Sequence, residues 1–156
     1  MRSVLALVLL IASPASAQGL ITDADARAFI ARQERAWNSG DMTAYFAGYA
    51  LTATFTDQAY VGDKPPVPYG TSSLPQARAQ ARKALARSKA SEGVNVQRIT
   101  SAQGGRAVIV VSRVASTLQA AGKTRRLCAV RRQTLMSHQG RILSSGKTDT
   151  YYPCPR

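Results

Sequence analysis

Asp57 is the residue whose type and position best suit acid–base chemistry. It closes a predicted strand over residues 51–57, in which apolar residues alternate with threonines. An aspartate in apolar surroundings can act as a general base when desolvation raises its pKa. An aspartate at a strand end more commonly caps or turns the chain, so the position leaves both roles open.

Other kinds of reactive site have little support in the sequence. The single histidine, His138, falls in a predicted hairpin turn, and one histidine offers no metal-binding constellation. The chain has no Ser-His-Asp order, no phosphate-binding loop and no motif for a cysteine nucleophile. We therefore expect no metal and no cofactor.

The two cysteines, Cys128 and Cys154, are expected to form an intramolecular disulfide. If the last hairpin turns at His138 and Gln139, Cys128 faces Asp149 and Cys154 lies five residues further on, about 17 Å away at full extension. This register excludes a direct cross-strand bridge, but the prolines beside Cys154 can fold the tail back. An intermolecular or swapped bridge and two free thiols are the alternatives.

The first 17 residues resemble a secretory signal peptide. Arg2 precedes an apolar run from Val4 to Ala12, and Ala15-Ser16-Ala17 offers a cleavage site. The apolar run is too short to span a bilayer core of about 30 Å. We expect a signal peptide over residues 1–17, one domain over residues 18–156, no membrane span, and a periplasmic or secreted product.

Charge is distributed unevenly along the chain, whose formal net charge is +13. From Lys64 onward, 17 lysines and arginines stand against only Glu92 and Asp149. Such a field attracts anionic molecules in a salt-dependent way. The excess can equally serve solubility alone, so the charge leaves an anionic partner as one of two interpretations.

Three helices are predicted in the first half. Thr22 and Asp25 can form a capping box for a helix over residues 23–38, and Asp41 can cap a short aromatic second helix. Residues 58–73, rich in proline and glycine, are expected to lack regular structure, as a lid or a disordered insertion. A third helix follows Ser73. Its cationic side is either solvated or a docking surface for an anion, and contains Arg78, Arg82, Lys83, Arg87 and Lys89.

The second half has the pattern of four antiparallel strands. The strands are predicted over residues 94–100, 106–118, 124–136 and 141–152, with glycine-containing turns between them. Arg131 and Arg132 fall on opposite faces of the third of these strands. If the concave face of the sheet is basic, a pocket there should prefer an anionic ligand.

This order of elements resembles the nuclear transport factor 2-like superfamily, which includes SnoaL-like proteins and ketosteroid isomerase. The resemblance covers the mature chain and rests on short motifs in the right order: Ala36-Trp37-Asn38-Ser39-Gly40-Asp41, Tyr45 and Tyr49, Thr54-Phe55-Thr56-Asp57, Gly70, and Gly140-Arg141-Ile142. It implies an α+β fold in which three N-terminal helices pack on a strongly curved antiparallel sheet around a conical pocket.

The resemblance also suggests roles for individual residues. Asp57 matches the general base of ketosteroid isomerase, whereas Gln33 stands in place of that family's oxyanion-binding tyrosine and Arg132 near its protonated acid. Both oxyanion donors therefore differ in kind, which argues against steroid isomerisation. Arg132 can act as an electrophile or neutralise Asp57.

Three functions follow as hypotheses. The first is a non-catalytic binding protein whose partner is an anionic small molecule, an envelope polyanion or a protein. The second is a SnoaL-like isomerase, cyclase or hydrolase that uses Asp57, with Trp37, Tyr45, Arg132 and Gln33 shaping the pocket. The third is a homodimeric scaffold that associates through the open sheet face. No specific nucleic-acid partner is expected.

Overall fold

A computed structural model describes residues 19–155, and the predicted signal peptide lies outside these residues. No helix among them is both long and apolar enough to cross a membrane. The elements are α1 (Asp23–Asn38), α2 (Met42–Ala47), β1 (Tyr49–Ala59), β2 (Val67–Ser73), α3 (Leu74–Leu85), β3 (Lys89–Ala102), the 3₁₀ turn η1 (Gln103–Gly105), β4 (Ala107–Ala120), β5 (Lys123–His138) and β6 (Arg141–Tyr152).

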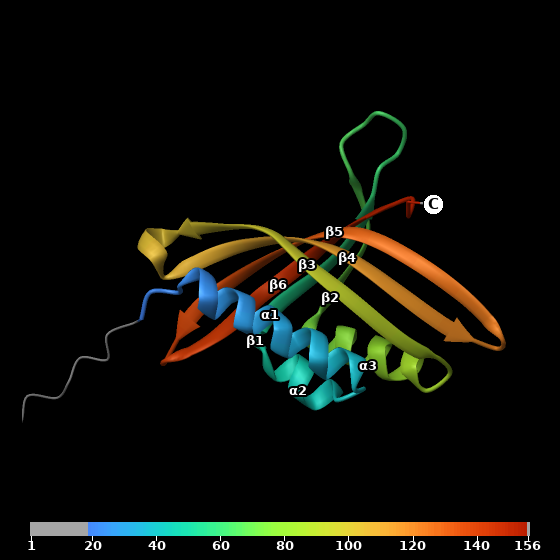
Figure 1. The fold of residues 1–156 in the computed structure, drawn as a ribbon, viewed down its shortest axis with the longest axis horizontal. Coiled ribbons are helices and arrows are strands. Elements are labelled where there is room, and N and C mark those ends of the chain that lie inside the picture. The colour runs from blue at the N-terminus through green and yellow to red at the C-terminus, as the bar shows by residue number, and fades with distance from the viewer. Residues whose placement is uncertain (1–18, 156) are drawn as a thin grey trace, which may run out of the picture.

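The six strands form one sheet in the order β2-β1-β6-β5-β4-β3. All neighbours are antiparallel except β1 and β6, which run parallel. The sheet is therefore mixed, whereas the sequence predicted an antiparallel one. All three helices lie on the same, concave face (Figure 1).

The three predicted helices are confirmed, with their caps. Thr22 and Asp25 form the capping box of α1, and the Asp41 carboxylate accepts a hydrogen bond from the backbone N–H of Ala44 in α2. Ser73 and Gln76 form a second capping box at the start of α3. Local side-chain chemistry thus fixes where these helices begin.

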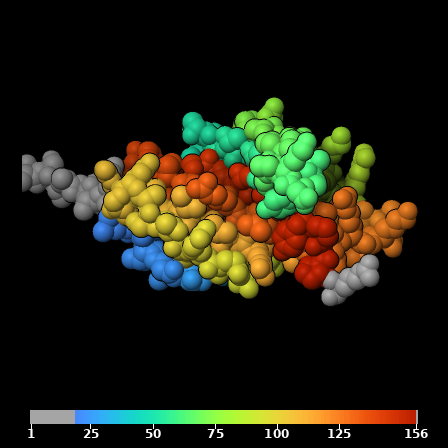
Figure 2. Space-filling view, turned by 90° about the horizontal axis from the view of Figure 1, so that it is seen from above, coloured from blue at the N-terminus to red at the C-terminus, as the bar shows by residue number. Residues whose placement is uncertain are grey.

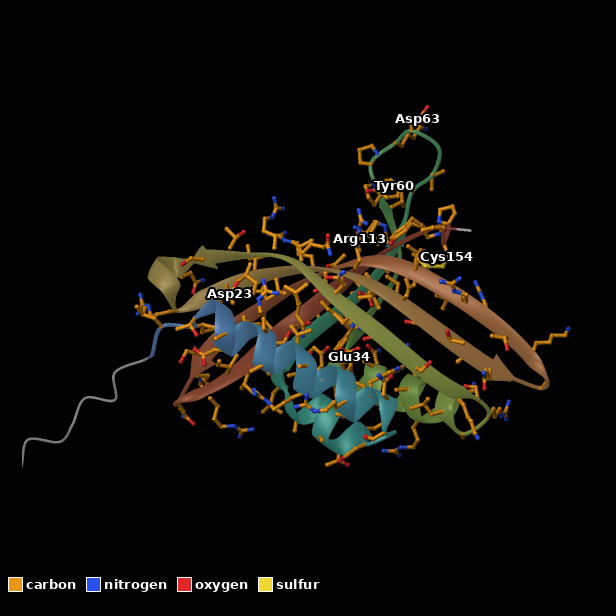
Figure 3. The ribbon with its side chains drawn as sticks, viewed as in Figure 1. Asp23, Glu34, Tyr60, Asp63, Arg113 and Cys154 are labelled. Atoms are coloured by element: carbon orange, nitrogen blue, oxygen red, sulfur yellow. A yellow bond between two sulfur atoms is a disulfide. The ribbon has the colours of Figure 1, made fainter. Side chains whose placement is uncertain are left out.

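The prediction that residues 58–73 lack regular structure is wrong. Residues 67–73 form β2, which pairs with β1 at the edge of the sheet. Pro68 is compatible with this position because an edge strand has a side that needs no ladder hydrogen bonds. The β1–β2 hairpin projects away from the helices and stands out from the surface (Figures 1 and 2). Its tip carries Asp63, with Tyr60 at its base (Figure 3).

The predicted disulfide is present, but the predicted strand register is wrong. Gln139 and Gly140, with φ values of 50° and 73°, form the turn, so that His138 pairs with Arg141. This geometry matches a two-residue hairpin turn. Together with a bulge further along, it places Cys128 opposite Tyr152. Cys154 lies only two residues after Tyr152, so a short turn brings it back to Cys128. The two Cα atoms are 5.1 Å apart.

The core is divided into two apolar clusters along the concave face. One lies under α1 and includes Phe29, Ile30, Val110 and Leu135. The other lies between α2, α3 and β1, and its main members are the aromatic residues Tyr45, Phe46, Tyr49 and Phe55, with Ala53 and Leu74. The aromatic side of α2 is thus part of the core.

Gly146 allows β1 and β6 to approach each other closely. It has φ of 136°, and a Cβ atom at this position would collide with the backbone of Thr54. Neither the dihedral angle nor the contact suits a residue with a side chain. The approach matters because β6 and β1 together carry the polar side chains that face the helices.

Candidate functional site

A chain of four charged side chains crosses the concave face. Arg131 on β5 forms two hydrogen bonds with Glu92 on β3, of 2.6 and 2.9 Å, and two with Asp149 on β6, of 2.7 and 3.1 Å. Lys147 Nζ lies 3.0 Å from the second oxygen of Asp149. Charges therefore alternate in sign, and each cation in this chain of ion pairs contacts at least one carboxylate.

These four side chains are largely removed from water. The Arg131, Glu92 and Asp149 side chains are 9%, 6% and 5% exposed. Burial opposes ionisation of Asp149 and Glu92, but the Arg131 guanidinium outweighs it and holds the pKa of both carboxyl groups below their usual values. A buried charge needs such a partner, because an unpaired one is strongly destabilising. The chain of ion pairs is thus locked in its ionised form.

Asp57 belongs to the same face but not to the chain of ion pairs. It lies beside Asp149 in the β1–β6 register, and no cationic group among residues 19–155 is within ion-pair distance of it. Its partner is Tyr151, whose hydroxyl donates a hydrogen bond of 3.3 Å to Oδ1. The side chain keeps contact with solvent. Even so, partial desolvation, reinforced by the charge of Asp149, raises the pKa of Asp57.

Asp57 lines a cavity of about 250 Å³ between the sheet, α2 and α3, which we call the cone pocket. One wall is apolar and aromatic, and the polar groups gather along β1 and β6. The residues of the pocket are Trp37, Tyr45, Phe46, Phe55, Thr56, Asp57, Ser72, Ala77, Gln80, Ala81, Ala84, Lys147, Asp149 and Tyr151. Ser72 is the only residue of the predicted lid segment among them, so this hairpin does not cover the pocket.

The cone pocket brings together three of the five predicted pocket residues. Trp37 and Tyr45 lie in its wall with Asp57. Tyr45 is buried and accepts a hydrogen bond of 3.2 Å from the Tyr49 hydroxyl; burial is the main cause that raises its pKa to about 12. Tyr45 therefore keeps its proton at neutral pH.

Gln33 and Arg132 lie elsewhere. The Gln33 side chain is on the buried side of α1, where Oε1 accepts a 2.8 Å hydrogen bond from Gln133 Nε2. Arg132 is exposed and points to the opposite face of β5 from Arg131. Neither residue lines the cone pocket, so the structure does not place them beside Asp57.

Sequence reasoning missed Arg131, Lys147, Asp149 and Tyr151. Their spacing could have identified three of them. Lys147, Asp149 and Tyr151 alternate along β6, and alternate residues of a strand lie on the same face. The correct hairpin register places Arg131 opposite Asp149. Arg132 was predicted instead because the resemblance places it near the protonated acid of ketosteroid isomerase.

No group of three or more histidine, cysteine, aspartate or glutamate side chains with metal-binding geometry occurs within residues 19–155. The polar groups that line the cone pocket include hydroxyl, carboxylate and ammonium groups. They are suited to hydrogen bonding and proton transfer with an organic molecule.

Solved structures with the same architecture come from several bacteria. The β subunit of benzoate 1,2-dioxygenase from Burkholderia mallei is 15% identical, with a TM-score of 0.67 over 86% of this chain and 93% of its own. A ketosteroid isomerase-like protein from Erwinia carotovora is 11% identical, with a TM-score of 0.64 over 82% and 94%. An NTF-2 like protein of unknown function from Shewanella oneidensis is 18% identical, with a TM-score of 0.60 over 81% and 97%.

At the level of sequence, no protein-family model and no curated protein matches the chain. The structural matches nevertheless agree in fold and cover most of each protein. The chain therefore has the nuclear transport factor 2-like fold, as its order of elements predicted. At these identities the likeness concerns the fold alone, since this fold serves unrelated functions.

Proposed function

We propose that this protein is an exported binding protein that holds a small, mainly apolar molecule in the cone pocket. The observation that carries the proposal is the position of Asp57. It is a carboxylate at the polar end of an aromatic cavity, with Tyr151 as its hydrogen-bond partner and no cation in ion-pair contact within the described residues. A ligand hydroxyl or amine can donate to it while the body of the ligand contacts Trp37 and Phe55.

The charges around the cone pocket argue for a neutral or cationic ligand. Arg131 is saturated by two carboxylates, and Lys147 is paired with Asp149. Asp57 adds a further carboxylate without adding a cation. An anionic ligand at this position would therefore meet repulsion from Asp57 and find no free positive charge. The volume of about 250 Å³ is slightly below the usual range of about 300–1,000 Å³ and limits the ligand to a small molecule.

Export is part of the proposal. It rests on the signal-peptide pattern of the first 17 residues and agrees with the Cys128–Cys154 disulfide, a bond typical of oxidising compartments. Expression of the full-length chain in a bacterial host, followed by mass measurement of the periplasmic product, tests it. We expect cleavage after Ala17; an uncleaved cytosolic product would contradict export.

Ligand binding is tested by screening small alcohols, phenols and amines against the purified protein. Trp37, the only tryptophan of the chain, lies in the pocket wall, so its fluorescence reports occupancy. Ala81→Leu fills the cavity, whereas Ala79→Leu adds the same bulk on the exposed side of the same helix. We expect the first variant to abolish binding and the second to preserve it. Equal effects of the two variants, or a preference for carboxylates whose binding is abolished by Ala81→Leu, would refute the proposal.

Proton transfer by Asp57 is the second candidate function, and its raised pKa favours it. A general base works best when its pKa approaches the working pH, and partial desolvation moves Asp57 in that direction. Deuterium exchange at the α-carbon of small cyclic ketones, followed by NMR, tests the idea. Exchange that is lost in Asp57→Asn would support catalysis. Exchange that is no faster than with Asp57→Asn would leave binding as the function of the pocket.

A further inference from the structure

A second cavity lies on the other side of Trp37 and Phe46, between α2, α3 and the start of β3. Its volume is about 770 Å³, three times that of the cone pocket. We call it the α3 groove. Its residues are Trp37, Asn38, Gly40, Met42, Thr43, Phe46, Arg78, Arg82, Leu85, Ser88, Lys89 and Ala90.

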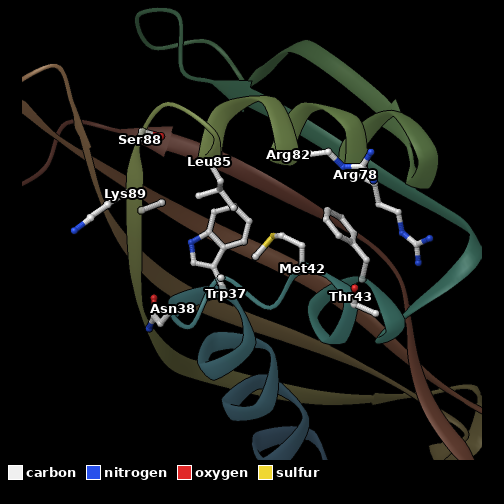
Figure 4. Close-up of a pocket in the computed structure, with 12 residues that line it drawn as sticks. Trp37, Asn38, Met42, Thr43, Arg78, Arg82, Leu85, Ser88 and Lys89 are labelled. Atoms are coloured by element: carbon white, nitrogen blue, oxygen red, sulfur yellow. The ribbon is translucent and has the colours of Figure 1, made fainter.

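The α3 groove combines an apolar floor with a cationic rim. Trp37, Met42 and Leu85 face one another between α1 and α3 (Figure 4). Arg78 and Arg82 stand together on one side of this floor, and Lys89 stands on the opposite side (Figure 4). No carboxylate lines the groove. None of the three cations has an ion pair with a residue in the described part of the chain.

The two arginines repel each other. Arg78 and Arg82 are four residues apart on α3, a spacing that brings side chains into neighbouring positions and makes like charges unfavourable. The Arg78 guanidinium also lies 5.8 Å from the centre of the Phe46 ring, so it is held near the groove. An anion between the two guanidinium groups would remove the repulsion and accept hydrogen bonds from both.

We propose that the α3 groove binds an amphipathic carboxylate, with its acid group at Arg78 and Arg82 and its alkyl chain along Trp37, Met42 and Leu85. The apolar floor favours the chain through burial from water, and the unpaired cations favour the acid group. A polyanion without an apolar part would leave the floor exposed. This site is distinct from the cone pocket, so it stands whether or not the cone pocket binds a ligand.

Decanoate, used below the concentration at which it forms micelles, is the test ligand. Titration calorimetry should show saturable binding that weakens as salt rises, because exposed charges are screened. Decanol has the same chain without the charge, and acetate has the charge without the chain. We expect both to bind at least about tenfold more weakly. Equal binding of decanoate and decanol would overturn the proposal.

Paired variants separate the groove from the net charge. Arg78→Gln with Arg82→Gln removes two charges at the groove. Lys83→Gln with Arg87→Gln removes two exposed charges outside it, one on α3 and one two residues past its end. We expect the first pair to weaken decanoate binding about tenfold or more and the second pair to change it less than about twofold. Equal losses in both pairs would show a diffuse charge effect only and refute the site.

A cavity-filling variant locates the ligand. Ala81→Leu closes the cone pocket and leaves every residue that lines the α3 groove in place. Decanoate affinity should therefore remain unchanged in this variant. Loss of decanoate binding in Ala81→Leu would place the carboxylate in the cone pocket and contradict the groove assignment.

Discussion

The cone pocket and the α3 groove share a wall but differ in whether their cations are paired with carboxylates. Trp37 and Phe46 line both cavities. At the cone pocket, Lys147 is paired with the buried carboxylate of Asp149, which is also paired with Arg131. In the α3 groove, Arg78, Arg82 and Lys89 have no carboxylate partner among residues 19–155. A basic sequence therefore says little about a site until each cation has been matched with its carboxylates.

The two acidic residues in the basic half of the chain account for this difference. Glu92 and Asp149 are the only carboxylates after Asp63, and both contact Arg131. They neutralise the concave face and leave the excess positive charge on the outside. Arg78, Arg82 and Lys89 of the α3 groove belong to this excess, whereas the charges on the concave face nearly cancel apart from Asp57.

The largest expected effect is the loss of Arg131. Arg131→Ala leaves Glu92 and Asp149 buried without their shared cation, and removing one partner of a buried ion pair costs about 3–5 kcal/mol. Urea unfolding should show this decrease in the free energy of unfolding. Arg132→Ala, at the exposed neighbour, should change it by less than about 0.5 kcal/mol. Similar free energies of unfolding for the two variants would mean that the chain of ion pairs does not stabilise the fold.

Gly146 should rank next. Gly146→Ala forces a side chain into a φ of 136° and into the backbone of Thr54, and should cost about 3 kcal/mol. The polar strand β6 would move away from β1, so the ligand affinity of the cone pocket should fall as well. Gly122→Ala, in a turn with open space around it, is the control and should cost only about 1 kcal/mol. Unchanged ligand affinity in Gly146→Ala would show that the cone pocket does not depend on the close approach of β1 and β6.

Acid should weaken the protein through Glu92 and Asp149. Their pKa values are lower in the folded state than the usual 4.5 and 3.8, so the stability they contribute is present above these values. It is lost as the pH falls through the lowered folded-state values. Thermal unfolding between pH 6 and pH 2 measures the loss. A variant with Glu92→Gln should lose less on acidification, and an identical decline would contradict the assignment.

Asp57→Asn should have the smallest effect on stability, and with the opposite sign. Because the pKa of Asp57 is raised in the folded state, its ionised form is disfavoured there at neutral pH. Replacing it should leave stability unchanged or increase it slightly, and the difference should vanish in acid. Thermal unfolding at pH 7 and pH 3 checks this. A clear loss at pH 7 would show that Asp57 is a structural strand-end residue.

Much of the fold could be predicted because its signals are local. The caps at Thr22 and Ser73 and the glycine turns mark where helices and hairpins begin and end. The strand β2 was missed because its proline suggested a loop, and only pairing with β1 makes it a strand. The pairing of β1 with β6 is equally non-local, since about ninety residues separate them.

The candidate site was harder to predict than the fold. Asp57, Trp37 and Tyr45 were found because helix spacing and strand alternation place them directly. Arg131 and Asp149 required the register of a 12-residue strand that contains a bulge, and the bulge leaves no clear mark in the sequence. The resemblance pointed to Arg132, whereas its neighbour Arg131 is the residue that forms the chain of ion pairs.

The most direct measurement is the titration of the side-chain carboxyl carbons of Asp57 and Asp149 by NMR. The two residues are neighbours across β1 and β6, but Asp149 is buried and paired with Arg131 and Lys147, whereas Asp57 keeps contact with solvent and has no ion pair among residues 19–155. We predict that Asp57 titrates above the ordinary aspartate pKa of 3.8 and Asp149 below it. Titration of Asp57 at or below 3.8 would show that its charge is already compensated, and would contradict its assignment as the open carboxylate of the pocket.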